Sequence, residues 1–125
     1  MPQYGNVAVI AVNSMNPNNS NALQLWRQSL HINGVTDKSC PRIAFVGIYE
    51  CGYINGRPAI RNIQNSISVI EQRAVAIRNL IMNQSPPSLP AIPKYQVWNQ
   101  VGGPGSNDQS VIDVVYSLFN SNLLQ

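Results

Sequence analysis

Charged side chains are scarce in this sequence. Asp, Glu, Lys and Arg make up only 10% of its 125 residues, against roughly a quarter in an average globular domain. Asn, Gln and Ser fill the expected surface instead. Such a surface has weak long-range repulsion, which favours a homo-oligomer or a protein partner. The net charge of +3 is by itself too small to indicate a nucleic-acid-binding protein.

Groups for catalysis and metal binding are equally sparse. The chain has one histidine, two cysteines and five carboxylates, and none of them shows a paired spacing such as CxxC or HxxxH. Structural zinc usually takes four ligands, so we predict no metal site, and nothing implies a cofactor. Cys40 and Cys51 lie about 16 Å apart along one predicted helix, too far for a disulfide.

Long apolar runs are missing too. No stretch of about 18 apolar residues is present, which excludes a membrane-spanning helix and a membrane partner. The first ten residues lack the basic start of a signal peptide, and two cysteines suit a reducing compartment. We therefore expect a cytoplasmic protein, with residues 1–125 forming one domain.

The apolar residues that are present recur at spacings of three and four, which predicts an all-α fold, a compact bundle of five or six helices. Within residues 3–15, Val9, Ile10 and Val12 would also suit a strand. The proline-rich segment 85–93 predicts an extended connector inside the bundle. The expected helices cover residues 3–15, 20–30, 40–51, 68–84, 94–101 and 108–122. The expected core contains Trp26, Phe45, Val46, Ile70, Ile77, Val115 and Phe119.

The helix over 40–51 has the clearest end signals. Ser39 or Cys40 is the expected cap, Pro41 falls in the first turn, and Gly52 is a natural stop. Gly47 in mid-helix costs about 1 kcal/mol relative to alanine, which predicts that another backbone crosses close to this face. The following Asn55-Gly56 pair predicts a tight turn or a very small hairpin.

Isoleucines continue at heptad spacing from residue 59 to residue 84, as in a helical seam. Ser68 and Glu71 match a capping box, so we favour a helix that begins near Ser68 and follows a looser arm. Ser106 and Gln109 form a second possible capping box, ahead of the last helix.

Cys40 is the one candidate nucleophile. A thiol at a helix N-terminus feels the positive end of the helix dipole, which favours the thiolate. A nucleophilic cysteine also needs a base, and the only histidine, His31, lies nine residues upstream. We favour the interpretation that Cys40 caps or packs, and keep a cysteine-dependent enzyme as an alternative.

Arginines gather in the middle of the chain, with Tyr49 and Tyr53 among them. Guanidinium groups match phosphate and carboxylate, and tyrosines stack on bases. The candidate ligand-binding residues are Arg42, Tyr49, Tyr53, Arg57 and Arg61. A nucleic-acid- or nucleotide-binding module would use Arg42, Arg57, Arg61, Arg73 and Arg78. The alternative is that these side chains form a solvated face.

The segments Ser39-Cys40-Pro41, Ala44-Phe45 and Gly52 to Pro58, with Asp113 to Phe119 near the end, resemble an uncharacterised family of small bacterial proteins. The resemblance implies a bacterial or phage origin and supplies no catalytic residues. The sequence departs from that family in its surface, where Asn and Gln replace Lys and Glu. We expect a non-catalytic binding protein, accessory or anti-defence, whose partner is a protein or a small anionic ligand.

Overall fold

Helices form all the regular structure of this computed structural model, which describes residues 2–105 and 108–125. No strand longer than an isolated bridge occurs in these residues. The predicted all-α bundle is confirmed. Its elements are α1 (Gln3–Asn13), α2 (Ala22–Asn33), α3 (Ser39–Glu50), the 3-10 turn η1 (Ile63–Asn65), α4 (Val69–Met82), α5 (Lys94–Gln100) and α6 (Gln109–Asn120).

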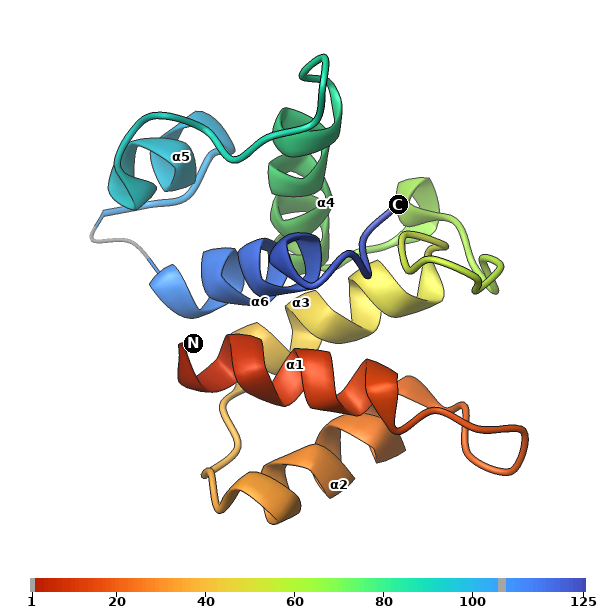
Figure 1. Cartoon of the computed structure of the whole chain (residues 1–125). Coiled ribbons are helices and arrows are strands. Elements are labelled where there is room, and N and C mark those ends of the chain that lie inside the picture. The colour runs from red at the N-terminus through yellow and green to blue at the C-terminus, as the bar shows by residue number, and fades with distance from the viewer. Residues whose placement is uncertain (1, 106–107) are drawn as a thin grey trace.

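The helix α3 lies at the centre of the bundle and packs against α2, α4 and α6 (Figure 1). The first helix, α1, lies between α2 and α6 and contacts both. The short helix α5 sits at the edge, where α6 is its main neighbour. Within the described part of the chain, no helix is long and apolar enough to cross a bilayer.

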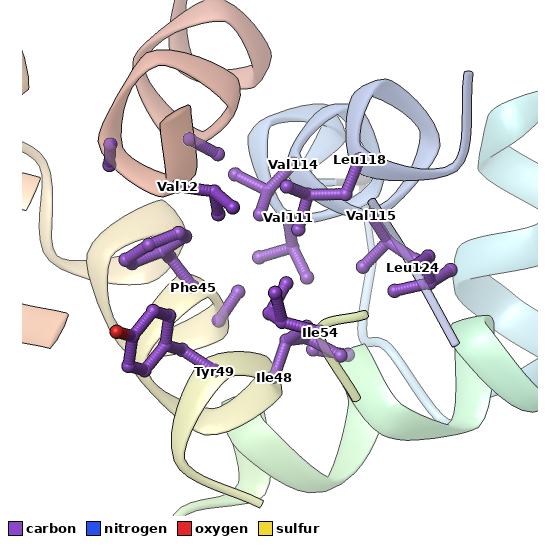
Figure 2. Close-up of a cluster of buried hydrophobic side chains, with 14 of the residues drawn as sticks. Val12, Phe45, Ile48, Tyr49, Ile54, Val111, Val114, Val115, Leu118 and Leu124 are labelled. Carbon is purple, nitrogen blue, oxygen red and sulfur yellow. The ribbon is translucent and has the colours of Figure 1, made fainter. Parts of the chain in front are cut away.

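The hydrophobic core lies between the inner faces of α1, α3 and α6, where Phe45, Val12 and Val111 lie close together (Figure 2). The fully buried side chains include four of the seven predicted core residues, namely Trp26, Phe45, Ile77 and Val115. The other three, Val46, Ile70 and Phe119, are only half-buried. The inner face of α3 carries Ala44, Phe45 and Ile48, so Val46 is turned about 100–160° away from these residues.

The helix α4 begins where the capping signal placed it. The side chain of Ser68 accepts a hydrogen bond from the Glu71 backbone N–H at 3.2 Å. Glu71 does not return the bond, because its carboxylate binds Arg61 and Ser66, so only half of the capping box forms. The predicted isoleucine seam does not extend into the segment before this helix, because Ile60 and Ile67 are 70% and 99% exposed.

The start of α3 differs from the prediction. Lys38 occupies the cap position without a side-chain bond, so the predicted cap at Ser39 or Cys40 is wrong, whereas Pro41 lies in the first turn as expected. Pro41 lies in the first turn of the helix, where a residue without an N–H needs no capping partner. The predicted cap at Ser106 lies outside the described residues. Asp108 caps α6 instead.

The end of α3 and the turn behind it follow the sequence signals. Gly52 has a φ of 89°, and the Tyr53 N–H then donates to the Ile48 carbonyl at 3.1 Å, which closes the helix. The Arg57 N–H donates to the Ile54 carbonyl at 3.0 Å, so the tight turn forms. It does not extend into a hairpin, because Ile54 pairs with Leu124 of the C-terminal tail.

Two glycines mark close helix contacts. A Cβ atom on Gly47 would lie 2.7 Å from Glu71 Cγ, so the predicted close approach is real, although a side chain and not a backbone makes it. A Cβ atom on Gly5 would lie 2.7 Å from the backbone oxygen of Asp113 and closer still to Ser117. The approach of α1 to α6 therefore depends on Gly5.

We predict that Gly5→Ala lowers the free energy of unfolding by about 1–3 kcal/mol, because α1 must move away from α6. Alanine alone would stabilise an exposed helix by about 1 kcal/mol relative to glycine, so the sign of the change is diagnostic. Urea unfolding measures it. Asn13→Ala at the exposed end of α1 is the control and should change stability by less than about 0.5 kcal/mol. A stabilised Gly5→Ala protein would contradict the close crossing.

Candidate functional site: the Arg57 cleft

The five predicted ligand-binding residues do not form one site. Tyr49 and Arg57 lie together at the rim between α2 and α3, and Arg61 is joined to that place through Glu50. Arg42 and Tyr53 lie in other surroundings.

Arg42 is engaged in a link between α2 and α3. Its Nη1 atom donates to Asp37 at 2.5 Å, and the same carboxylate accepts from the buried Trp26 indole at 3.0 Å. Burial works to raise the pKa of Asp37, yet the hydrogen bonds from Trp26 and Arg42 outweigh it and hold that pKa below its usual value. Arg42 is therefore part of the scaffold in this structure.

Tyr53 belongs to a cluster at the C-terminal tail. The guanidinium of Arg78 lies 4.7 Å from the Tyr53 ring centroid, and its Nε atom donates to the Gln125 carbonyl at 2.8 Å. The Gln125 N–H donates in turn to the Tyr53 carbonyl at 2.9 Å. These contacts fasten the tail to the segment behind α3.

Arg61 is held by two carboxylates. Its two Nη atoms donate to both oxygens of Glu71, at 2.7 and 2.6 Å, and its Nε atom donates to Glu50 at 2.8 Å. Such a forked pair is among the stronger polar contacts in proteins. Burial works to raise the pKa of Glu71, but the bonds from Arg61 and Ser66 prevail and lower it. Arg61 thus ties the arm after α3 to both α3 and α4.

Arg73 lies 5.5 Å from the Trp98 ring centroid, near α5. The five arginines of the nucleic-acid interpretation therefore have five different sets of neighbours. Each of them contacts an aromatic ring, a carboxylate or the tail. Arg57 also lines two neighbouring cavities, and Arg42 lines a third.

The Arg57 cleft is a cavity of about 270 Å³ at the N-terminal end of α2, bordered by the turn that follows α3. It is lined by Ser20, Asn21, Ala22, Tyr49, Glu50, Arg57, Pro58 and Ile60. A second hollow of about 400 Å³ adjoins it on the side of Met15 to Pro17 and shares Ser20 and Arg57 with it. Arg57 thus stands between the two.

Tyr49 builds the inner wall of the cleft. The guanidinium of Arg57 lies 5.4 Å from the centroid of its ring, within cation–π range. Its hydroxyl donates to the Ser20 carbonyl at 2.9 Å and also contacts Met15 Sδ at 3.1 Å. Burial raises the pKa of Tyr49 although the nearby Arg57 opposes this, so the phenol stays neutral and fixes the loop before α2.

The first turn of α2 forms the opposite wall. It contains no acidic residue, and the positive end of a helix dipole attracts anions. The Asn21 side chain accepts from the Gln24 N–H at 3.0 Å and so satisfies one of the free N–H groups of that turn. Glu50 also lines the cleft and accepts one bond from Arg61, which binds Glu71 as well, so these three side chains together keep one net negative charge.

Arg57 has a buried donor without a partner. Its Nε atom is enclosed and makes no hydrogen bond to the described residues, and none of their carboxylates pairs with its guanidinium. The backbone around it is fixed by the Ile54 carbonyl and by Gln125.

Cys40 has a different neighbour from the predicted one. Burial, followed by a hydrogen bond to the Asp108 carboxylate and the repulsion of its charge, raises the pKa of the Cys40 thiol. Lys38 opposes this shift and lies 3.7 Å from Asp108. The predicted base, His31, is exposed near the end of α2. The thiol is therefore kept protonated rather than activated.

Both cysteines are free, as the helical spacing requires. Among residues 2–105 and 108–125, no three His, Cys, Asp or Glu side chains gather in a way that would hold a metal ion.

Sequence reasoning missed the residues that the loop before α2 contributes, above all Ser20 and Asn21. The sequence pattern around these two residues predicted only a turn and a helix cap. The Tyr49 hydroxyl binds the carbonyl of Ser20, which lies 29 residues earlier in the sequence, and so holds this loop next to Arg57. No local sequence pattern reveals a contact over that separation.

The fold and this cleft define a small all-α protein with an arginine- and tyrosine-lined site between two helices. The chain belongs to the family of unknown function DUF6979, which it matches over residues 1–125. No curated protein and no solved structure matches it. The resemblance seen in the sequence is thereby confirmed.

We predict that Glu71→Gln lowers the free energy of unfolding near pH 7 by about 1–3 kcal/mol, because two charge-assisted bonds from Arg61 are weakened. Glu50→Gln should cost less, since Glu50 is more exposed and accepts only one bond. Because the pKa of folded Glu71 is lowered, its contribution is complete above the unfolded value of roughly 4.3 and is lost as pH falls through the folded value. Chemical unfolding from pH 7 to pH 3 should show the gap between wild type and Glu71→Gln closing in acid; a constant gap contradicts the ion pair.

We also predict slow alkylation of Cys40. At pH 8, iodoacetamide should modify Cys40 more slowly than a small free thiol, because its pKa is raised. Asp108→Asn removes the neighbouring charge and should increase the rate, whereas the matched change Asp113→Asn on the same helix should not. Peptide mass mapping separates Cys40 from buried Cys51. Wild-type Cys40 reacting faster than the small thiol would revive the nucleophile interpretation.

Proposed function

We propose that this is a non-catalytic binding protein that holds a small anionic group, a carboxylate or a phosphate, in the Arg57 cleft. The observation that carries the proposal is the enclosed Arg57 Nε atom, which has no hydrogen-bond partner among the described residues. A buried donor left unpaired costs about 1–3 kcal/mol. A ligand oxygen at this place would remove that cost.

Charge supports an anion. Arg42 and Arg61 are paired with carboxylates, whereas no carboxylate in the described part of the chain forms an ion pair with the guanidinium of Arg57. The first turn of α2 adds a positive dipole end to the same cleft,. The ligand would therefore meet the positive charge of Arg57 and free backbone N–H groups, in a cleft that Glu50, bound by Arg61, also lines.

Size supports a small group. A volume of about 270 Å³ lies just below the range of roughly 300–1,000 Å³ usual for drug-sized ligands. A phosphate or a short carboxylic acid fits such a space, and the ring of Tyr49 provides one flat wall for it. A nucleotide would have to extend into the second hollow beyond Arg57.

The absence of a catalytic pair among the described residues is consistent with binding alone. Tyr49 and Cys40 both have raised pKa values, and the nearby Glu50 is bound by Arg61. General acid–base catalysis needs groups that titrate near the working pH. We further propose a cytoplasmic protein of a bacterium or phage, in an accessory or anti-defence role. A nucleic-acid-binding module is less well supported, because the arginines are dispersed.

The test is titration with inorganic phosphate and, separately, with acetate, followed by the backbone amide NMR signals. Signals of Ser20 to Leu23 and of Asn55 to Arg57 should shift together in a saturable way. Arg57→Gln should weaken binding about 10- to 100-fold, the equivalent of one charge-assisted bond. Arg27→Gln, which removes the same charge at an exposed position of α2, is the matched control and should leave affinity unchanged.

Comparison of the two probes identifies the ligand class, since tighter phosphate or tighter acetate binding names the preferred group. Equal weakening by Arg57→Gln and Arg27→Gln would show attraction to net charge only and would contradict the cleft. Shifts spread over Arg42, Arg73 and Arg78, with binding that falls steeply as salt rises, would favour nucleic acid instead.

A further inference from the structure

The outer face of α3 forms a further recess, which shares Asn21 and Glu50 with the Arg57 cleft. This α3 groove has a volume of about 360 Å³ and lies between the N-terminal ends of α2 and α4. It is lined by Asn21, Leu23, Arg42, Ile43, Val46, Glu50 and Glu71. The residues from α3 recur at spacings of three and four, so they form one stripe along the helix.

Three of the side chains that line the groove are apolar. Leu23, Ile43 and Val46 are all only half-buried, although their residue types are usually found inside proteins. Val46 lies on the face of α3 that points away from the core residues Phe45 and Ile48. The bundle thus leaves one stripe of its central helix partly exposed.

The ends of the stripe carry opposite charges at equal distances from its middle. Arg42 precedes Val46 by four residues, and Glu50 follows it by four. Each is therefore about 6 Å along the helix axis from Val46, in opposite directions. A second α3 that runs antiparallel across the first would place Arg42 opposite Glu50 at both ends.

We propose that the α3 groove is the interface with a second copy of this chain, and that the two-fold axis of the dimer passes close to Val46. An interface with this symmetry must be complementary to itself, and the stripe is. Val46 meets Val46 of the second copy at the centre, Ile43 packs beside it, and two Arg42–Glu50 pairs close the ends.

The existing ion pairs continue through such an interface. Within one copy Arg42 already binds Asp37, and Glu50 already binds Arg61. In the dimer the signs alternate from Asp37 to Arg42, then to Glu50 of the second copy and its own Arg61. No two like charges become neighbours in this row. The sparse charge of the whole chain, 10% of its residues, also leaves little repulsion between two copies.

Sedimentation velocity of the wild-type protein over a range of concentrations tests the proposal. We expect a reversible monomer–dimer equilibrium. Val46→Asp places two like charges against each other at the two-fold axis and should abolish the dimer. Ile32→Asp makes the same kind of change at an isoleucine that is 59% exposed on α2, and it should leave the dimer intact. Circular dichroism melting confirms that both variants are folded.

A charge exchange gives a second readout that does not depend on Val46. Arg42→Glu and Glu50→Arg should each weaken the dimer, and the double variant should recover part of it, because the pairs between the copies re-form with reversed signs whereas the contacts with Asp37 and Arg61 within each copy stay broken. Val46→Cys should link two copies by a disulfide under mild oxidation, whereas Ile32→Cys should not.

A wild-type protein that stays monomeric, or a dimer that Val46→Asp leaves intact while it remains folded, would overturn the proposal. Val46 does not line the Arg57 cleft, so Val46→Asp should retain phosphate binding. A failure of the dimer is therefore distinguishable from a failure of the binding function. Weak association of the monomer with another protein through the same stripe would also count against a second copy as the occupant.

Discussion

The forked contact of Arg61 with Glu71 and Glu50 holds the arm between α3 and α4 in place. That arm contains no helix except the 3-10 turn η1, and it exposes two isoleucines that a core would otherwise take. Hydrophobic burial fixes its path only in part, through Ile63, which packs against the core. The guanidinium shared by α3 and α4 also holds it, together with the bond from the Ile60 N–H to the Glu50 carbonyl at 2.8 Å, and these contacts place Pro58 and Ile60 at the Arg57 cleft. The close approach of Gly47 to Glu71 belongs to the same arrangement, because a larger residue would push the carboxylate away from Arg61.

Because the chain has so few charged side chains, the way in which they are paired determines which charged groups remain for a ligand or a second copy to contact. The carboxylates of Asp37, Glu50 and Glu71 are bound by Arg42 and Arg61, and Asp113 is bound by Lys94 at 2.6 Å. Arg57 instead contacts the ring of Tyr49, which attracts a cation without neutralising it. The same pairing leaves the outer stripe of α3 with a charge of each sign at its ends. Both proposed surfaces thus arise from how a small set of charges is divided.

The sequence predicted the helices well, because local signals determine them. Pro41, Gly52, the Asn55-Gly56 turn and the Ser68 cap are all where the chain's short-range chemistry placed them. Contacts between distant segments were beyond such signals. The pairing of Ile54 with Leu124 replaced the expected hairpin, and Asp108 rather than His31 became the neighbour of Cys40. Val46 was expected in the core because its type is apolar, whereas its angular position on α3 turns it outwards. Of the five candidate ligand residues, the structure brings Tyr49 and Arg57 into contact, and this pairing depends on the fold.

The C-terminal tail gives the cleft a link to the end of the chain. Gln125 donates from its side chain to the carbonyls of Gly52 and Arg57, and Leu124 is buried beside Ile54. The turn that carries Arg57 cannot open without releasing these two residues. A ligand that holds Arg57 in place therefore also slows the fraying of the tail, and occupancy of the cleft becomes readable as resistance of the last residues to an exopeptidase.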